Sequence, residues 1–199
     1  MRSIFILLPF LVIISSFSPP ETIPAKLRFK VLKNDKEIGW INATKTISGN
    51  QILYEVETEL EIKLVFTQKV VYSSKALYVN NFLQKSVSKS FVNKKLQHHC
   101  VTLWKGNHYE IKRDHDIERL DRKVFYSGIM LYFKEPGDEH LVYSEMAGQD
   151  NFMAKGDGVY LLTDGKSKRK NSYWYKGGLL HKAFIDHSLV DFEIIRVRQ

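Results

Sequence analysis

The stretch Ile52-Leu-Tyr-Glu-Val-Glu-Thr-Glu-Leu-Glu-Ile62 decides the fold class of this 199-residue chain. Apolar side chains and Thr58 occupy one set of alternate positions, and the other set is rich in glutamate: Glu55, Glu57, Glu59 and Glu61. Successive side chains point to opposite faces only in an extended strand. The stretch therefore predicts a long β-strand with one face in the core and a row of glutamates in solvent.

Shorter alternating runs lie on both sides of this strand, separated by turn-forming residues. We expect strands within residues 26–31, 38–47, 66–72, 77–92, 96–104, 108–113, 141–144, 159–162, 166–175, 179–185 and 190–194. Ser73-Ser74-Lys75 predicts a turn, residues 114–123 predict a loop, and Lys85 and Lys89 predict a lysine row beside the glutamates. The fold class is mostly β. We expect a strongly curved antiparallel meander sheet, closed or partly closed into a barrel, because curling removes exposed edges.

One apolar stretch, residues 125–136, lacks this alternation. Apolar residues recur there at spacings of three and four, which predicts one short apolar helix near 127–134. Ser127 is expected to be its N-cap, with its hydroxyl accepting a hydrogen bond from a backbone N–H of the first turn. A helix this short is unstable alone in water. We therefore expect strands to cover it and Tyr132 and Phe133 to be core residues.

The N-terminus has the layout of a secretory signal peptide: a basic Arg2, an apolar run over 4–14 and small residues up to position 18. We predict a signal peptide over 1–18, a flexible lead-in over 19–25 and a single β domain over 26–199. The apolar run is short for a membrane span, although a retained anchor is the alternative. The expected location is periplasmic or secreted.

The chain carries a formal charge of +8, from 30 Lys and Arg against 22 Asp and Glu. In an exported protein this favours an anionic membrane surface or acidic polysaccharide over nucleic acid, with solubility alone as the alternative. The strongest basic cluster is the hairpin around Lys168, Arg169 and Lys170, close to aromatic residues that suit a membrane surface or glycan. Cys100 is the only cysteine, so no intrachain disulfide is expected.

Several clusters contain the residue types that form metal or catalytic sites. They are His98-His99-Cys100 with His108; Asp114, Asp116 and Glu118; Glu135, Asp138, Glu139, His140 and Glu145; and Asp186-His187-Ser188. His98 and Cys100 share one strand face, and two ligands do not make a metal site. The Asp114, Asp116 and Glu118 group lacks the glycine of a calcium-binding loop. Asp186, His187 and Ser188 are adjacent in sequence and cannot form a catalytic triad. The carboxylates and His140 of the group from Glu135 to Glu145 could serve as general acid and base in a hydrolase. The alternative is that Glu135 and Glu145 tie the helix exit to the sheet.

A set of short motifs follows the start of the helix. It comprises Tyr126-Ser127, Leu131-Tyr132-Phe133, Glu135-Pro136, Val142-Tyr-Ser-Glu145 and Tyr173-Trp-Tyr-Lys-Gly-Gly178. These motifs resemble a family of uncharacterised exported bacterial proteins, a domain-of-unknown-function family with a Leu-Tyr-Phe-x-Glu-Pro signature. The resemblance implies an all-β envelope protein without an assigned activity, and its structural residues here are Ser127, Tyr132, Phe133, Glu135, Pro136 and Glu145. More remotely, the layout resembles unclosed barrels that carry lipids or lipoproteins across the periplasm.

These observations favour a non-enzymatic binder of an apolar or amphiphilic ligand, such as a lipid, at the cell envelope. The alternatives are the hydrolase and a purely structural envelope component. The inward faces of the strands are expected to line an apolar space suited to acyl chains, and their residues include Phe29, Trp40, Tyr54, Val56, Leu60 and Phe192. The basic hairpin would hold an anionic head group at its mouth. No cofactor or metal is expected.

Overall fold

The computed structural model describes residues 25–63, 66–187 and 190–197. The predicted signal peptide over 1–18 and the lead-in up to residue 24 lie outside this part of the chain, and Ala25 already belongs to the first strand. None of the helices in these ranges has the length and apolar character needed to cross a membrane.

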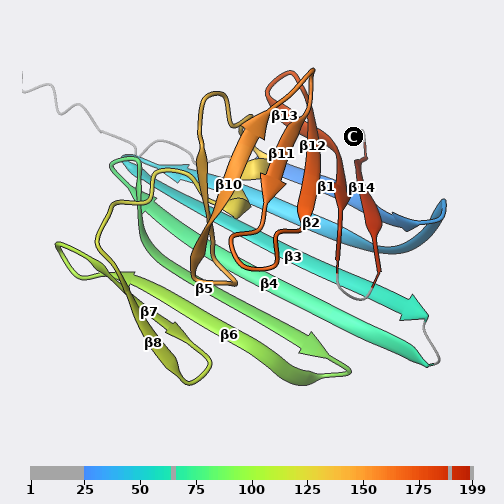
Figure 1. Ribbon diagram of the computed structural model, residues 1–199, viewed down its shortest axis with the longest axis horizontal. Helices are drawn as coiled ribbons and strands as arrows, with labels where there is room; N and C mark the ends of the chain where they lie inside the picture. Colours follow the sequence, from blue (N-terminus) through green and yellow to red (C-terminus); the bar gives the residue numbers. More distant parts are fainter. Residues whose placement is uncertain (1–24, 64–65, 188–189, 198–199) are drawn as a thin grey trace, which may run out of the picture.

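In the described part of the chain, fourteen antiparallel strands form one sheet, which confirms the predicted fold class. The first eight are β1 Ala25–Lys33, β2 Lys36–Ser48, β3 Gln51–Lys63, β4 Thr67–Val79, β5 Phe82–Val92, β6 Lys95–Trp104, β7 Tyr109–Arg113 and β8 Asp116–Leu120. After the helix η1 Gly128–Tyr132 come β9 Leu141–Ser144, β10 Gln149–Lys155, β11 Tyr160–Thr163, β12 Lys170–Lys176, β13 Leu179–Ile185 and β14 Phe192–Arg196. Figure 1 shows the long strands β2–β6 running obliquely below the shorter strands β10–β13.

The sheet curls until its first and last strands pair, but it does not close by a strand ladder. β1 pairs with β14, so the order is β8 through β1, then β14 back to β9, and the two edges are β8 and β9. The segment before η1 links β5 to the edge strand β9: Val124 accepts a hydrogen bond from the Leu83 amide of β5, and Tyr126 accepts one from the Tyr143 amide of β9. The barrel is therefore partly closed, by a segment outside the named strands.

The predicted short helix is present as a five-residue 3₁₀ helix, η1, which packs against β3, β4, β9 and β13. Ile129, Met130 and Leu131 of η1 are buried. The Phe29 and Tyr132 rings pack 5.3 Å apart between centroids, and the Tyr54 and Phe133 rings pack 5.7 Å apart. The helix and the residue after it therefore join the core contributed by the strands, as a plug.

Replacing Phe133 with alanine should lower the free energy of unfolding by about 3 kcal/mol, through lost burial and an unfilled cavity. Phe133 is buried, whereas Phe125, just before the plug, is 54% exposed. Phe125→Ala is thus the matched control and should leave stability nearly unchanged. Urea unfolding checks both, and equal stabilities of the Phe133 variant and the parent protein would mean that the plug does not hold the core.

Two turn predictions were wrong because alternation alone does not locate a tight turn. Ser73-Ser74-Lys75 lies inside β4, and the chain reverses instead at Asn80 and Asn81, which have φ of 52° and 66°. A two-residue hairpin turn with positive φ at both positions is favoured by asparagine. Residues 114–123, predicted as a loop, contain the turn and second strand of the β7–β8 hairpin.

The lysine row that neutralises the glutamates was also misassigned. β3 pairs with β4, not with β5, so Lys85 and Lys89 lie one strand too far away. Lys75 pairs with Glu55 at 2.5 Å, and Lys69 pairs with Glu59 at 2.6 Å. Like-charge repulsion along β3 is therefore relieved by lysines on the neighbouring strand.

Candidate ligand groove

The sheet forks where the β1–β2 hairpin separates from the β3–β4 hairpin. The ladder between β2 and β3 ends at the pair Gly39–Leu60. Beyond it, residues 36–37 of β2 continue to pair only with β1, and residues 61–63 of β3 pair with β4. In Figure 1 the blue β1–β2 hairpin accordingly curls away from the far ends of β3 and β4. We call this the fork end of the barrel.

Gly39 is the residue that permits the fork. A β-carbon placed on Gly39 would lie 1.9 Å from the carbonyl oxygen of Glu59 and 2.9 Å from the α-carbon of Leu60. The two strand backbones therefore touch at this point before they separate. An irregularity in the pairing of β1 with β2 immediately precedes it, after Val31, and such bulges bend strands.

A groove of about 700 Å³ opens at the fork, within the range of volumes typical of small-molecule sites. It is lined by Lys33, Asn34, Lys36, Glu37, Ile38, Gly39, Trp40, Glu59, Glu61, Ile62 and Lys63. Ile62 is buried on the inward face of β3, so the groove reaches from the outer surface to the edge of the core.

The groove combines an apolar surface with a charged rim. Ile38, Trp40 and Ile62 provide the apolar part. Of its carboxylates, Glu37 pairs with Lys30 at 3.2 Å, and Glu59 pairs with Lys69. Lys33, Lys36 and Lys63 have no ion pair within the part of the chain that the structure describes, so their ammonium groups remain available on the rim.

Five of the six residues expected to line the interior do face inward. Phe29, Tyr54, Val56 and Leu60 are buried, and Phe192 packs against them from β14. The space they surround is mostly filled by η1 and its flanks. What remains beside the helix is a cavity of about 50 Å³, lined by Gly128, Leu131, Tyr132, Tyr173, Leu180, Ile185 and Ile194. This cavity has room for one or two water molecules, so the expected acyl-sized interior space is not found among the described residues.

Trp40 was predicted to face inward, and this was wrong. It pairs with Glu59 and Lys30, which lie on the outer face, whereas its neighbour Ile41 pairs with Phe29 and Thr58 on the inner face. Alternate residues of one strand cannot change faces without a bulge. Trp40 therefore lines the groove from outside the core.

The basic hairpin does not line the groove. Lys168 donates to the Gly165 carbonyl at 2.6 Å, Arg169 lies 4.0 Å from Asp186, and Lys170 is exposed at the start of β12. β11 and β12 are separated from β2 in the sheet by β13, β14 and β1. The predicted head-group contact with this hairpin is thus at a different place from the groove.

The signature residues surround η1 rather than a solvent-filled site. Ser127 was expected to cap the helix, but its hydroxyl makes no such bond: it accepts from Tyr78 at 2.6 Å and donates to Glu145 at 2.5 Å. The Glu145 carboxylate itself accepts from the Ile129 amide at 3.1 Å and so takes the capping role. Burial raises the pKa of Glu145, although these hydrogen bonds lower it in part.

The carboxylates near the helix exit do not form one site. The Glu145 side chain is buried against η1, whereas the Asp138 side chain is exposed. Pro136, a signature residue, is buried beside the helix exit. Glu135 accepts a hydrogen bond from the Tyr160 hydroxyl at 2.8 Å, and its amide donates to Gly178. Glu135 therefore ties the helix exit to the sheet, as the alternative interpretation predicted, whereas Glu145 binds the start of the helix and not its exit. This geometry lends no support to the hydrolase hypothesis.

The residues of the remaining clusters make hydrogen bonds in turns or form ion pairs. Asp114 accepts from the His99 amide at 2.8 Å and lies 3.2 Å from His98, and the amide bond is the main cause of its lowered pKa. Glu118 pairs with Arg113 at 2.5 Å. His108 sits in the turn after β6, at the opposite end of that strand from His98. Ser188 lies outside the described residues.

Within the described ranges, no group of three or more His, Cys, Asp or Glu side chains is arranged to hold a metal ion. Cys100 is buried, and burial raises the pKa of its thiol. Sequence reasoning missed the groove residues Lys33, Lys36, Glu61 and Lys63. The signal that marks the site is the glycine inside the β2 pattern, which indicates a bulge or a close backbone approach.

The comparisons with known proteins bear on the fold. One solved structure that the chain resembles is a β-barrel-like protein of the domain of unknown function DUF1849 from Brucella abortus, with a TM-score of 0.56 and 9% sequence identity over 89% of this chain and 96% of that chain. At that identity the likeness shows the fold alone. No curated protein matches the sequence. A family model described as "Domain of unknown function (DUF6134)" matches residues 29–197, and the chain therefore belongs to that family.

Proposed function

We propose that this protein is an exported cell-envelope component that binds an amphiphilic ligand, without catalysis, in the groove at the fork end. The observation that carries the proposal is the 700 Å³ groove itself, in which Trp40 and Ile38 adjoin the free ammonium groups of Lys33, Lys36 and Lys63. A cleft of this size with an apolar wall and a few charged groups suits a ligand that has both characters.

The arrangement favours a single-chain amphiphile with an anionic head group. Its apolar chain would lie along Ile38, Trp40 and Ile62, where apolar surface leaves water. Its head group would meet the lysines on the rim. Glu61, also on the rim, has no ion pair in the described ranges and would disfavour a ligand with several negative charges.

Replacing Trp40 with alanine should weaken binding of a fluorescent fatty acid or lysophosphatidylglycerol about tenfold, because a large aromatic contact surface is lost. Trp174→Ala is the matched control. Trp174 lies on β12, with the Lys182 ammonium 5.8 Å from its ring centre, and does not line the groove. Titration of each variant gives the comparison. Failure of the parent protein to bind at micromolar concentration would reject the proposal and leave the structural-component alternative.

The lysines should contribute in a different way. Lys33→Gln, Lys36→Gln and Lys63→Gln together should weaken binding at low salt and have little effect at high salt, because salt screens charges at an exposed rim. A loss of affinity independent of salt would contradict the assigned role of the rim.

A further inference from the structure

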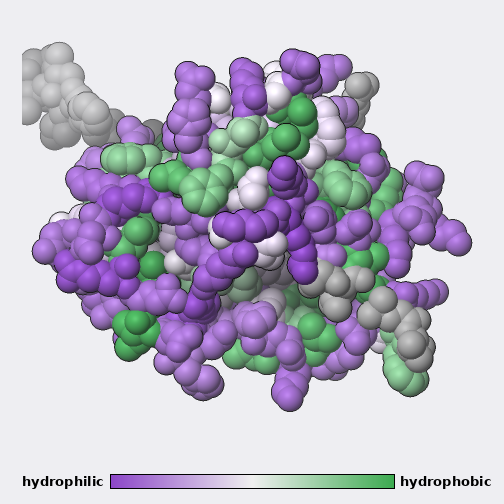
Figure 2. Space-filling model, in the orientation of Figure 1, coloured by the Kyte–Doolittle hydropathy of each residue, from purple (hydrophilic) through white to green (hydrophobic). Residues whose placement is uncertain are grey.

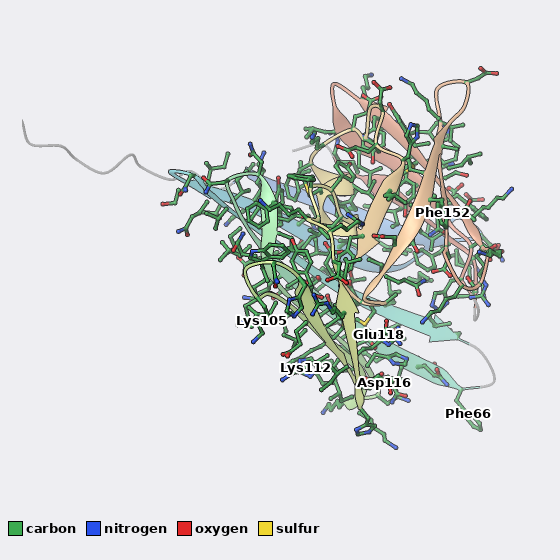
Figure 3. The ribbon with its side chains drawn as sticks, turned by 60° about the vertical axis from the view of Figure 1, so that its left-hand side comes forward. Phe66, Lys105, Lys112, Asp116, Glu118 and Phe152 are labelled. Carbon is green, nitrogen blue, oxygen red and sulfur yellow. The ribbon has the colours of Figure 1, made fainter. Side chains whose placement is uncertain are left out.

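Phe66 is exposed to an unusual degree for an aromatic side chain. It follows β3 at the fork end and is 79% exposed, more than any other large apolar residue in the described part of the chain. Figure 3 shows it projecting from the far end of the β3–β4 hairpin, away from Phe152 on β10. Burying a phenylalanine side chain is more favourable than leaving it in water, so a ring on this protruding end is available for contact with another phase or molecule.

Lysines without ion pairs surround this end. Lys36, Lys63, Lys94 and Lys95 are exposed in or beside the turns of three successive hairpins. None of the four has an ion pair within the described residues, whereas lysines farther along the strands, such as Lys75, do. This face of the molecule therefore carries excess positive charge.

The turns lie side by side in the sheet. Asn93, in the β5–β6 turn, exchanges two hydrogen bonds with Lys69 near the start of β4: its amide donates at 2.8 Å, and its side chain accepts at 3.0 Å. Lys63 and Lys36 line opposite sides of the groove. Asp35 and Glu61 are the carboxylates on the same segments that have no ion pair in the described ranges. The lysines outnumber them.

In the view of Figure 2 the surface is mainly hydrophilic, with small and separate apolar patches. At the fork end, one protruding aromatic ring lies on a segment near several lysines without ion pairs in the described ranges. Aromatic rings settle at the boundary between lipid head groups and acyl chains, and lysines near that boundary are attracted to anionic lipids.

We propose that the fork end docks on an anionic lipid surface, with the Phe66 ring at the head-group boundary and Lys63, Lys94 and Lys95 above the phosphates. An acidic polysaccharide would satisfy the lysines but would not require an exposed phenylalanine, so lipid is the partner that both observations favour. Docking does not depend on a ligand in the groove, and it would place the groove mouth at the bilayer.

The test is co-sedimentation of the mature protein with vesicles of phosphatidylcholine, with or without phosphatidylglycerol, at low and high salt. We expect binding only to the anionic vesicles at low salt. Phe66→Ala should lower the partition coefficient about tenfold, and Lys94→Gln with Lys95→Gln should lower it by at least as much. Because these side chains are exposed, the variants should melt like the parent protein.

Matched controls lie elsewhere on the molecule. Phe152→Ala removes another exposed ring, which is 53% exposed. Lys105→Gln with Lys112→Gln removes the same charge from lysines near Glu110. Both should bind vesicles like the parent protein. An equal loss in these controls would overturn the assignment of the docking surface.

Two other outcomes separate the hypotheses. Binding to soluble dextran sulfate that is unaffected by Phe66→Ala, together with no binding to vesicles, would overturn lipid docking in favour of a polyanion. Trp40→Ala should leave vesicle binding unchanged, since Trp40 lies inside the groove. Vesicle binding by the parent protein without any binding of lysophospholipid would support docking while rejecting the proposed groove function.

Discussion

Replacing Glu145 with alanine is expected to lower the free energy of unfolding by about 4 kcal/mol, by leaving buried polar groups without partners and creating a cavity. The Glu145 carboxylate is 3% exposed and accepts hydrogen bonds from the Ser127 hydroxyl and the Ile129 amide. Alanine would leave both donors unsatisfied beside the plug. Because the same residues connect η1 to β9, the core should loosen as a unit.

Urea unfolding followed by circular dichroism measures this effect. Asp138→Ala is the control, since Asp138 is exposed in the loop after the helix, and it should be nearly neutral. If Glu145→Ala proved as stable as Asp138→Ala, the capping role of Glu145 would be wrong.

Glu145→Gln gives the pH dependence of the same site. Burial raises the pKa of Glu145 above its ordinary value of 4.5, so the folded state favours the protonated carboxyl. As pH rises from that value to the folded pKa, the unfolded chain loses its proton first, and Glu145 contributes less and less stability. Glutamine keeps an acceptor oxygen but does not titrate. The stability of Glu145→Gln relative to the parent protein should therefore increase with pH over this window, and a difference that stays constant would contradict the raised pKa.

The strand pattern of this protein was predictable because each side of the sheet faces a different medium. Alternation from Ile52 to Ile62 places β3 correctly, and Pro136 and the apolar spacing place the plug. Inner residues such as Phe29 and Tyr54 follow from the same pattern, because burial is a property of every second position. Turns were less predictable. Asn80 and Asn81 reverse the chain because both have a positive φ, and the spacing of apolar residues does not indicate such a backbone conformation.

The candidate groove was not predictable from alternation. Trp40 is apolar, and composition alone favours an inward position for it, but its register with Glu59 places it outside. The capping of η1 was missed for a related reason. Ser127 has the residue type and position of an N-cap. The Glu145 carboxylate, 18 residues later in the sequence, nevertheless accepts the hydrogen bond from the Ile129 amide at the start of the helix. Contacts between distant segments decide both sites, and local sequence does not contain them.

Replacing Gly39 with alanine should lower the free energy of unfolding by about 4 kcal/mol, more than most overpacked sites do. The added methyl group would lie 1.9 Å from the Glu59 carbonyl oxygen, which belongs to a paired strand and cannot rotate away. Relief requires β2 and β3 to separate where their ladder ends, next to Leu60, so the groove should also change shape.

Gly156→Ala is the matched control for Gly39→Ala. A β-carbon at Gly156 would meet the side chain of Val159 at 3.5 Å, an ordinary contact, and the position does not have a positive φ. Thermal and urea unfolding of the two variants therefore compare the same added methyl group in a tight and an open site. If both variants unfold like the parent protein, the strands at the fork are free to separate, and the groove is not held open by close backbone contact at Gly39. If only Gly39→Ala is destabilised and it also loses binding of lysophosphatidylglycerol, the contact that ends the ladder is the one that shapes the groove.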